Sequence, residues 1–495
     1  MAVKIRDKVK LNFDEYKDKV NACWIGKNIG GTIGTPYEGT MEYLDVQGFV
    51  TEAGAPLPND DLDLQLVWLH AVEKMGLGAI QANVLGEFWL SFIPPHWNEY
   101  GIGKANMKRG LIPPLSGDYQ NEWKDSNGAW IRTEVWACLA PACPKLAADF
   151  SVEDAKVDHG SGEGTYAAAF VAAMQSAAFA LKDIRKCIEI GLAEIPATCR
   201  VADSVKFTIE CSDKGLAPKD TRDLIQQRNA DMGNGWFEAP SNVAYTILGL
   251  LYGEGDFKKS MIYAVNCGDD TDCTAATVGA TLGIMGGMAA IPEDWKAHIG
   301  DDIVTISINK GDACRKVPAT CTELTERVVT QAPHIMFAAD APAVLVDGEN
   351  EIAENIAEEF ISECLASRVA AGIKPYSMKF EYSFLTAEVY LDKAPDIEPD
   401  GEITVNVICY NRCPVLDKAQ YNLTARWWLP EGFSVSGKQT ARMPRTSSRR
   451  DPMARCYFSF TIKAGESVAA SNKCVLEICG DDRMTPMYIP VVLLG

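Results

Sequence analysis

The sequence has little positive charge and no basic block. Its 495 residues contain 47 Lys and Arg against 67 Asp and Glu, which gives a formal net charge of −20 and a pI of about 4.8. Binding to the phosphates of nucleic acid requires a basic surface, so no nucleic-acid partner is expected. Backbone N–H groups or a bound cation could still hold a small anion locally.

Zinc-ligand and disulfide patterns are also missing. The chain has five histidines, its sixteen cysteines are scattered, and no C-x-x-C pair occurs. Such cysteines fit reduced thiols that serve as small core residues. The opening stretch MAVKIRDKVKLNFDEYKDKV alternates in charge and lacks the apolar run of a signal peptide. These features together predict a cytoplasmic protein.

Long hydrophobic runs are absent but for one stretch, residues 273–291. It reaches the lower edge of the roughly 17–25 residues that a membrane crossing needs. Ala, Gly and Thr dominate it, small residues recur at helical spacing, and four acids follow between residues 293 and 302. This pattern favours a closely packed, buried helix of a soluble protein over a membrane span.

The overall composition, 47% apolar and 23% charged, is that of a globular protein. The length of the chain predicts at least two domains. Helical periodicity with nearby stop glycines predicts helices up to about residue 370, for example over 61–76, 165–192, 241–253 and 350–372. After residues 372–375 come six short alternating β-branched and aromatic runs separated by turns, at 383–393, 401–411, 421–430, 454–465, 473–481 and 487–495. We therefore expect an all-α domain over 1–372 and an antiparallel, immunoglobulin-like β-sandwich over 376–495.

Acidic residues gather at two predicted helix N-termini. In PNDDLDLQLVWL (58–69), Asn59 suits an N-cap, and Asp60, Asp61 and Asp63 occupy the first turn. Favourable interaction with the helix dipole, about 0.3–1 kcal/mol, is a complete ordinary explanation for that cluster alone.

The second cluster, in NCGDDTDCTAATVGATLG (266–283), precedes an almost wholly apolar helix. Burial of that helix would draw Asp269, Asp270 and Asp272 toward the interior, where unpaired carboxylates cost several kcal/mol each. A divalent cation such as Mg²⁺, Mn²⁺ or Ca²⁺ would compensate. The spacing does not fit an EF-hand, but the two acidic N-termini could converge on a two-metal centre.

A glycine-rich loop, GKNIGGTIGTPYEG (26–39), ends beside Glu38. It lacks the Lys-Ser/Thr end of a Walker loop and does not follow a predicted strand, as a dinucleotide-binding loop should. Two interpretations stay open: an ordinary turn between helices, or a loop that presents the Glu38 carboxylate to a ligand.

Taken together, these motifs resemble the ADP-ribosylglycohydrolase family over about residues 15–340. The resemblance is carried, in chain order, by GGTIGTPYE (30–38), NDDL (59–62), NGAWIR (127–132), DHGSGEG (158–164) and DDTDC (269–273). It implies an all-α orthogonal helical fold with a binuclear Mg²⁺ or Mn²⁺ centre. It also implies cleavage of the bond between ADP-ribose, or a related ribosyl group, and an N- or O-linked acceptor on a small molecule or a modified protein.

The same resemblance implies roles for individual residues. Glu38 would be the carboxylate at the scissile bond, and the substrate's ribose and diphosphate would lie against Asn127, Gly128, His159, Gly160, Gly162 and Gly164. The metal ligands would be Asn59, Asp60, Asp61, Asp270, Asp272 and Cys273.

The departures from the family pattern concern the metal ligands. Gly31 replaces an Asp, Asn59 and Leu62 replace threonines, and Cys273 stands where Thr or Ser is expected. A thiol is a poor Mg²⁺ ligand, so we expect one metal site to be well built and the second to be altered. Asp63 and Asp269, or the hydroxyls of Thr271 or Thr274, could supply a replacement oxygen.

Several other side chains allow two interpretations. His159 could instead bond a loop carbonyl, and Arg132 could pair with a structural carboxylate rather than with a phosphate of the ligand. The rings of Trp130, Tyr166 and Trp236 could be core residues or could stack on adenine. Two functions compete with the glycohydrolase: a two-metal phosphohydrolase, and a non-catalytic ADP-ribose-binding or structural relative.

Overall fold

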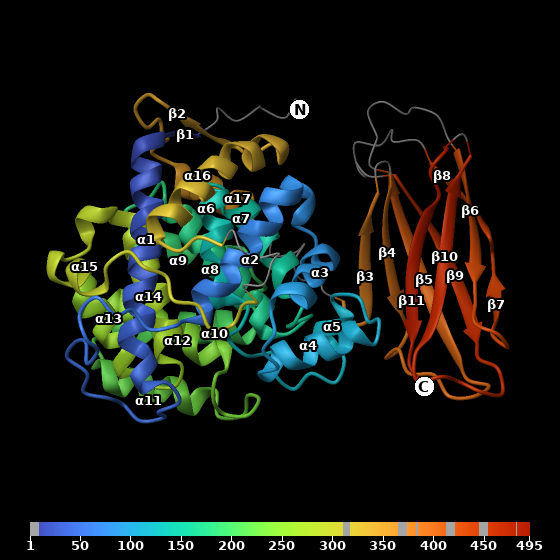
Figure 1. Cartoon of the computed structure of the whole chain (residues 1–495), viewed down its shortest axis with the longest axis horizontal. Coiled ribbons are helices and arrows are strands. Elements are labelled where there is room, and N and C mark those ends of the chain that lie inside the picture. The colour runs from blue at the N-terminus through green and yellow to red at the C-terminus, as the bar shows by residue number, and fades with distance from the viewer. Residues whose placement is uncertain are drawn as a thin grey trace. The chain divides into compact units, whose positions relative to one another are not determined.

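The computed structural model describes residues 9–309, 317–364, 374–382, 385–411, 421–444, 454–481 and 483–495. The chain divides into two compact units. We call the first, residues 1–103 and 121–372, the helical unit, and the second, residues 104–120 and 373–495, the strand unit. Helices make up the first and antiparallel sheets dominate the second, so the predicted fold class is confirmed (Figure 1).

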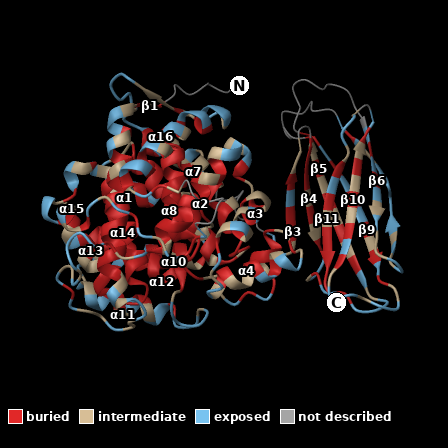
Figure 2. Ribbon diagram, viewed as in Figure 1, coloured by how far each residue is buried: buried red, intermediate tan, exposed pale blue. Residues whose placement is uncertain are grey.

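The helical unit is built from α-helices of very different burial. Figure 2 shows α1, α8 and α14 buried along nearly their whole length, whereas α11, α13 and α15 carry exposed side chains. In chain order the α-helices are α1 (Phe13–Gly34), α2 (Asp60–Met75), α3 (Ala82–Phe92), α4 (Asn98–Lys108), α6 (Glu134–Leu139), α7 (Pro144–Ala155), α8 (Glu163–Ala178), α9 (Ile184–Ala193), α10 (Arg200–Asp213), α11 (Pro218–Arg228), α12 (Ala239–Tyr252), α13 (Phe257–Asn266), α14 (Thr271–Gly286), α15 (Glu293–Ile299), α16 (Cys321–Ala338) and α17 (Ile356–Ser362). The 3-10 helices are η1 (Thr35–Tyr37), η2 (Gly76–Ala79), η3 (Trp130–Arg132) and η4 (Met288–Ala290).

Glycines let α1 and α14 lie backbone against backbone. A β-carbon added at Gly26 would lie 2.2 Å from the Gly279 carbonyl oxygen, and one at Gly30 would lie 2.3 Å from the Ala275 carbonyl carbon. At Gly34 it would lie 2.4 Å from the Asp272 Cα. The partners run in opposite directions, so the two helices are antiparallel and the end of α1 meets the start of α14. This packing confirms the small-residue stretch as a buried helix as far as Gly286, whereas residues 288–290 form the separate 3-10 helix η4, none of whose residues is buried.

Two of the predicted helices differ from the structure. The stretch 165–192 is interrupted between α8 and α9, because the Asp183 carboxylate accepts hydrogen bonds from the backbone N–H groups of Arg185 and Lys186 and starts a new helix there. Of the stretch 350–372, the helix α17 covers Ile356–Ser362, and residues 365–372 lie outside the described part of the chain.

The expectation of helices alone before residue 370 missed a short parallel pair of strands. β1 (Val9–Asn12) pairs with β2 (Ala343–Val346), in the register Val9 with Ala343 and Asn12 with Val346. Strands of four residues are too short for alternation to reveal them. The pair ties the start of α1 to the segment that follows α16.

The strand unit contains two antiparallel sheets around one apolar core. One sheet has the strand order β11-β10-β6-β8 and the other β3-β4-β5-β9-β7. The six segments predicted as strands are β4 (Leu385–Leu391), β5 (Glu402–Asn411), β6 (Tyr421–Trp428), β9 (Arg455–Lys463), β10 (Asn472–Gly480) and β11 (Met487–Leu493). The shorter β3 (Ser377–Glu381), β7 (Ser434–Gly437) and β8 (Thr440–Met443) were not predicted.

A segment from the middle of the helical sequence completes the strand unit. Residues 104–120, which include α5 (Leu115–Asp118), place Leu111, Leu115 and Tyr119 in the same apolar core as the strands. The Tyr119 hydroxyl donates a hydrogen bond to the Asp396 carboxylate, and the Ser471 hydroxyl donates one to the Arg109 carbonyl. Sequence periodicity does not reveal this insertion, because the segment is short and has no strand pattern.

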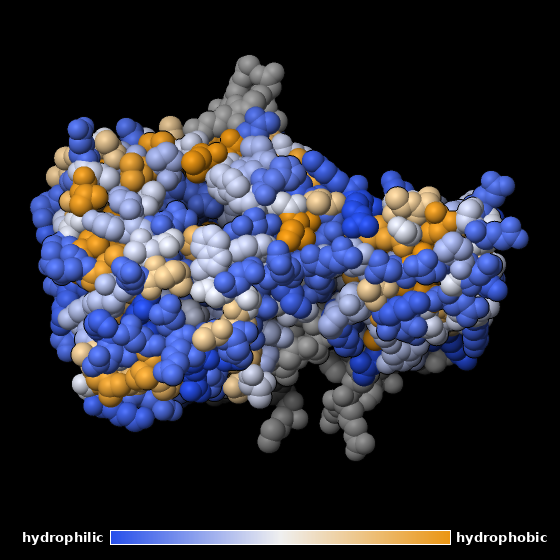
Figure 3. Space-filling view, turned by 90° about the horizontal axis from the view of Figure 1, so that it is seen from below, coloured by the Kyte–Doolittle hydropathy of each residue, from blue (hydrophilic) through white to orange (hydrophobic). Residues whose placement is uncertain are grey.

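The surface seen in Figure 3 is mostly hydrophilic, with hydrophobic side chains in small scattered groups. Over the described residues, none of the helices has both the length and the apolar character required to cross a bilayer.

Candidate metal centre

The N-termini of α2 and α14 and the residue after η1 bring acidic side chains together. Ligand atoms of Glu38, Asp270 and Asp272 lie within 4.8 Å of one another, and so do those of Asp61, Asp272 and Cys273. Asp272 is common to both groups. The convergence predicted for two distant acidic helix starts therefore exists, with one carboxylate between two adjoining sets of donors.

Several of these carboxylate oxygens have no hydrogen-bond partner although they are buried. They are Asp61 Oδ2, Asp270 Oδ1 and Asp272 Oδ1. Burial raises the pKa of all three carboxyl groups, and neighbouring carboxylates raise the pKa of Asp61 and Asp270 further. Buried oxygens that lack a donor are costly, so this arrangement calls for a cation or for protons.

Asp60 is half-buried at the edge of the same cluster. The Tyr100 hydroxyl donates a hydrogen bond of 3.1 Å to Asp60 Oδ2. Burial and the Asp272 charge raise the Asp60 pKa to about 6.

Glu38 lies at the rim, held there by pairing between its loop and the turn before α14. Gly39 N–H donates to the Asp269 carbonyl at 2.8 Å, and Asp269 N–H donates to the Thr40 carbonyl at 2.7 Å. Glu38 is exposed as a residue, but its carboxyl group lies near Asp272 and Asp60. Partial burial and these two charges raise the Glu38 pKa to about 8. The prediction of a glycine-rich loop over residues 26–39 is wrong for most of its length, because residues 26–34 belong to α1 and residues 35–37 form η1. The position of Glu38 at the end of this helical run fits the interpretation that the segment presents a carboxylate.

Asn59 caps α2, as predicted, and this use limits it as a ligand. Its Oδ1 accepts the Asp61 N–H at 2.7 Å. Its Nδ2 is buried without a partner and faces Gly31, where a β-carbon would lie only 1.9 Å from it. Gly31, the residue that replaces the family's Asp, has no side chain, and the Asn59 amide occupies the space that this leaves. The ligand role of Asn59 stays a prediction.

Cys273 acts as a hydrogen-bond donor in this structure. Its Sγ donates to Asp61 Oδ1 at 3.2 Å. Burial, followed by the charges of Asp270 and Asp61, raises the pKa of the thiol well above its ordinary value. A protonated thiol has no charge to offer a hard cation.

Most of the oxygens proposed as replacements for the Cys273 ligand have hydrogen-bond partners elsewhere. Asp63 Oδ2 accepts the backbone N–H groups of Ile306 and Ser307 at 2.6 and 2.7 Å, whereas Asp63 Oδ1 is buried without a hydrogen-bond partner. Asp269 accepts the Phe237 N–H and the Asn242 amide. The hydroxyls of Thr271 and Thr274 donate to the carbonyls of Gly34 and Thr271. That Asp63 or Asp269 compensates for Cys273 stays a prediction.

Lys27 is a part of the site that sequence reasoning missed. It lies in the middle of α1, is fully buried, and donates to the Ile131 carbonyl at 2.7 Å. Its Nζ also lies 3.1 Å from Glu134 Oε2 and 3.8 Å from Asp61 Oδ2. Burial would lower its pKa, but Glu134 and Asp61 outweigh that effect, so the pKa lies above the ordinary value. A lone lysine inside an apolar, glycine-rich helix was the available signal.

Asn127 contacts the acidic centre, and its neighbour Gly128 packs closely against Glu99. Asn127 Nδ2 donates to Asp270 Oδ2 at 2.6 Å, and the Trp130 indole N–H holds the Asn127 Oδ1 at 2.9 Å. A β-carbon at Gly128 would lie 2.1 Å from Glu99 Oε1. Their predicted contact with substrate stays a prediction, while the hold of Asn127 on Asp270 is a finding.

The histidine-bearing loop, residues 158–164, is packed into the helical unit. His159 is fully buried, and its Nδ1 bonds the Lys124 carbonyl at 3.0 Å, the structural alternative considered for it. A β-carbon at Gly164 would lie 2.3 Å from His159 Nδ1, and one at Gly162 would lie 2.2 Å from the Lys124 carbonyl oxygen. Gly160 has a φ of 51°. These glycines allow close packing, and their role in substrate binding stays a prediction.

Arg132 takes the structural alternative too. Its guanidinium pairs with Asp154 at 2.9 Å and with Asp158 at 2.8 Å, fully buried. Among the proposed stacking rings, Trp130 is fully buried, whereas Trp236 is 41% exposed, stacks on Phe237 and meets Trp123 edge-on. Only Trp236 of these two has a face that a ligand can reach.

The donor sets were compared with the metal that the family pattern implies. Glu38, Asp270 and Asp272 offer carboxylate oxygens, two of them buried without partners, and fit Mg²⁺ or Mn²⁺. The set that contains Cys273 does not fit a hard cation, because its thiol is protonated and engaged with Asp61.

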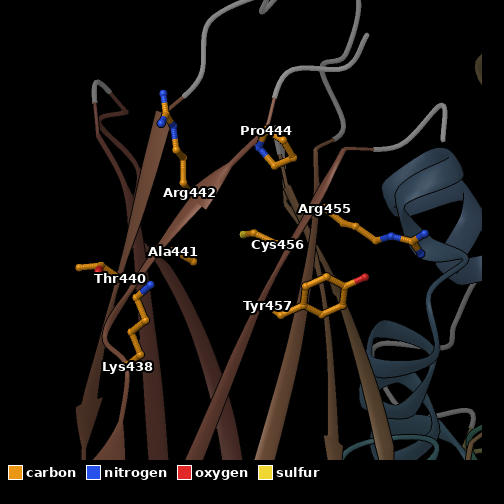
Figure 4. A pocket seen from close by; sticks show the side chains of 8 residues that line it. All are labelled: Lys438, Thr440, Ala441, Arg442, Pro444, Arg455, Cys456 and Tyr457. Atoms are coloured by element: carbon orange, nitrogen blue, oxygen red, sulfur yellow. The ribbon is translucent and has the colours of Figure 1, made fainter. Parts of the chain in front are cut away.

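The strand unit holds a cavity of different chemistry, of about 390 Å³, along β8 and β9 (Figure 4). Three of the described side chains that line it are cations, and the described lining is Lys438, Thr440, Ala441, Arg442, Pro444, Arg455, Cys456 and Tyr457. Among these described residues there is no carboxylate to hold a metal ion.

Comparison with known proteins agrees with the motifs. No curated protein matches the chain. A solved structure described as an ADP-ribosylglycohydrolase-related protein complex is similar at 19% identity, covering 65% of this chain and 100% of that one, with a TM-score of 0.41. A FixG-related protein from Vibrio parahaemolyticus is similar at 10% identity over 23% of this chain and 98% of that one, with a TM-score of 0.19. The family model for ADP-ribosylglycohydrolase matches residues 12–331, and because this is well over half of the sequence, the chain belongs to the ADP-ribosylglycohydrolase family.

Proposed function

We propose that this protein is a metal-dependent glycohydrolase that cleaves the bond between ADP-ribose, or a related ribosyl group, and an N- or O-linked acceptor. Family membership supports a hydrolase of the glycohydrolase type. The observation that carries the proposal is the pair of buried carboxylate oxygens without partners, Asp270 Oδ1 and Asp272 Oδ1, beside the exposed Glu38.

Glu38, Asp270 and Asp272 would hold Mg²⁺ or Mn²⁺, with Asp60 at the edge of the site. When bound, such an ion lowers the pKa of a water molecule and orients it and the ribose hydroxyls. The oxocarbenium-like charge that develops at the anomeric carbon is stabilised by a nearby carboxylate, and Glu38 is the accessible one. The Glu38 oxygen that does not bind the ion can also exchange a proton with the leaving group or the attacking water.

The other residues of the centre orient the carboxylates. Asn127 fixes one oxygen of Asp270 and leaves the other free for a ligand. Tyr100 does the same for Asp60. Rigid support of this kind lets charge stabilisation act without reorganisation during the reaction.

The test is product analysis with the purified full chain, Mg²⁺ or Mn²⁺, and substrates ADP-ribosylated on Arg or Ser. Free ADP-ribose is the expected product, and Asp270→Asn should lower the rate on the order of 1,000-fold through loss of cation-assisted charge stabilisation. AMP or inorganic phosphate as product would favour a two-metal phosphohydrolase instead. Binding of ADP-ribose without turnover of any of these substrates would favour the non-catalytic alternative.

A further inference from the structure

Lys27 places a fixed positive charge beside one half of the acidic centre. Its ammonium meets three oxygens, those of Ile131, Glu134 and Asp61, and is closed off from solvent. Glu134 is held in turn by the amides of Gln65 and Gln175 at 2.9 and 3.0 Å. The close packing of α1 on α14 at Gly26 and Gly30 flanks Lys27 and fixes the helix that carries it.

The two halves of the centre differ in what already satisfies them. Asp61 has Lys27 at its Oδ2 and the Cys273 thiol at its Oδ1. On the other half, no ion pair within the described part of the chain reaches Glu38, Asp270 or Asp272, and Asp270 Oδ1 and Asp272 Oδ1 are buried without hydrogen-bond partners. On one half the protein itself supplies a partner for each oxygen of Asp61, and the other half needs a ligand.

We infer that the Lys27 ammonium supplies the charge that a second divalent cation would otherwise supply, so that the centre binds one cation, held by Glu38, Asp270 and Asp272. An ion placed among Asp61, Asp272 and Cys273 would be repelled by the buried ammonium, whose Nζ lies 3.8 Å from Asp61 Oδ2. Lys27 is thus a positioning residue that sets the number of ions. This inference rests on the proposed function, because it takes the acidic centre to be a cation site.

The stoichiometry of Mn²⁺ tests the inference without any activity assay. Metal-free full-length protein is titrated with Mn²⁺ by calorimetry, and electron paramagnetic resonance reports whether bound ions are magnetically coupled as a close pair. We expect one ion per chain and no coupled signal. Two ions in the unaltered protein would overturn the inference but leave the proposed function intact, whereas no binding at all would overturn both.

Substitutions separate the lysine from the cysteine. Cys273→Ser, which supplies a hydroxyl oxygen, should still bind one ion, because Lys27 remains. Lys27→Met combined with Cys273→Ser should bind two and give the coupled signal. Two ions in Cys273→Ser alone, or one ion in the double variant, would show that Lys27 does not set the number.

The matched control is Lys19→Met. Lys19 is also a buried lysine of α1, but it pairs with Glu15 and the Phe179 carbonyl, so the number of ions should not change.

If Lys27→Met with Cys273→Ser fails to fold because Glu134 is left unpaired, the addition of Glu134→Gln removes that buried charge, and the expected number of bound ions remains two.

Discussion

The helical unit and the strand unit differ in what they bury and in where the net charge lies. The strand unit contains 18 Lys and Arg and 15 Asp and Glu, a net charge of +3, so the helical unit carries −23. Among the described residues of the strand unit, Lys104 is the one charged side chain that is buried, and the other buried polar side chains are Asn106, Ser116, Ser377, Thr386, Asn411 and Asn472. The helical unit buries Asp, Glu, Lys, Arg and His side chains in contact with one another.

The interiors of the two units therefore have different roles. The sheets enclose alternating apolar side chains, and Trp427 packs on that core while Trp428 of the same strand is 50% exposed. Such a core contributes stability. The buried charges of the helical unit lower its stability, and catalytic and metal-binding groups are commonly found among such desolvated charges. We therefore expect cation binding and catalysis in the helical unit and a stabilising role for the strand unit.

The largest effect is expected from Glu38→Gln. Loss of the carboxylate at the rim should lower the rate of ADP-ribose release by about 100–10,000-fold, the range of a general acid or base. Glu402→Gln, at an exposed position of β5, should leave the rate unchanged. Steady-state kinetics of both variants measures the difference. Equal loss in the two variants would remove the distinction between the units.

Gly30→Ala should break the helical unit through packing. The new β-carbon would lie 2.3 Å from the Ala275 backbone, and overpacking of this kind costs about 1–3 kcal/mol or more. Because α14 carries Asp270 and Asp272, we expect weaker cation binding together with a lower melting temperature. Gly48→Ala has open space around its β-carbon and should change neither. Unchanged cation affinity in Gly30→Ala would mean that the α1–α14 contact does not position the carboxylates.

Asn127→Ala should produce a smaller loss, because Asn127 orients a ligand without being essential to its charge. Removal of such a support typically costs 10–100-fold in metal affinity or activity. Asn472→Ala is the corresponding change in the strand unit, where the amide bonds the Ala469 and Leu493 carbonyls. It should lower stability alone. Calorimetric titration with Mn²⁺ and thermal melting distinguish the two results.

The smallest effect is expected from pH on the metal-free protein. Burial raises the pKa of Asp60 and Asp269 to about 6 and that of Glu238 to about 7, against ordinary values of about 4 in the unfolded chain. Between these values the folded state keeps protons that the unfolded state releases. The free energy of unfolding of the helical unit should therefore fall as the pH rises from about 4 to 7.

Hydrogen exchange of peptides at pH 5 and pH 7, corrected for the intrinsic rate, measures this change in each unit. Protection of α2 and α14 should decrease toward pH 7, and Mn²⁺ should restore it. The strands β5 and β10 should show no such decrease, because no carboxylate is buried in the described part of their unit. An equal decrease in both units would contradict the role of the buried acids.

Much of the architecture was predictable because local patterns decide it. The acids and Asn59 mark the start of α2, and six alternating runs mark six strands. The convergence of α2 and α14 was predictable only as a hypothesis supported by resemblance, since it depends on glycine contacts between helices far apart in the sequence. Local patterns carry no information on which distant helix packs against which.

The finer chemistry of the site was not predictable for the same reason. The charge beside Asp61 comes from Lys27, thirty-four residues earlier, and its partner Glu134 lies in α6. Asp63 looked like a spare ligand in the first turn of α2, yet its carboxylate caps the backbone at Ile306 and Ser307. Sequence spacing shows which residues share a helix turn, but not which oxygens are already occupied.

The pairing of α1 with α14 has a consequence for synthesis on the ribosome. α1 ends at Gly34 and α14 begins at Thr271. At roughly 5–20 residues per second, translation of the intervening chain takes about 12–47 s. For that time the glycine face of α1 lacks its helix partner, although Asp61 and Glu134, the carboxylates that Lys27 meets, are synthesised earlier. The packing of α1 is therefore completed long after its synthesis, and nascent-chain chaperones have that interval in which to bind its glycine face.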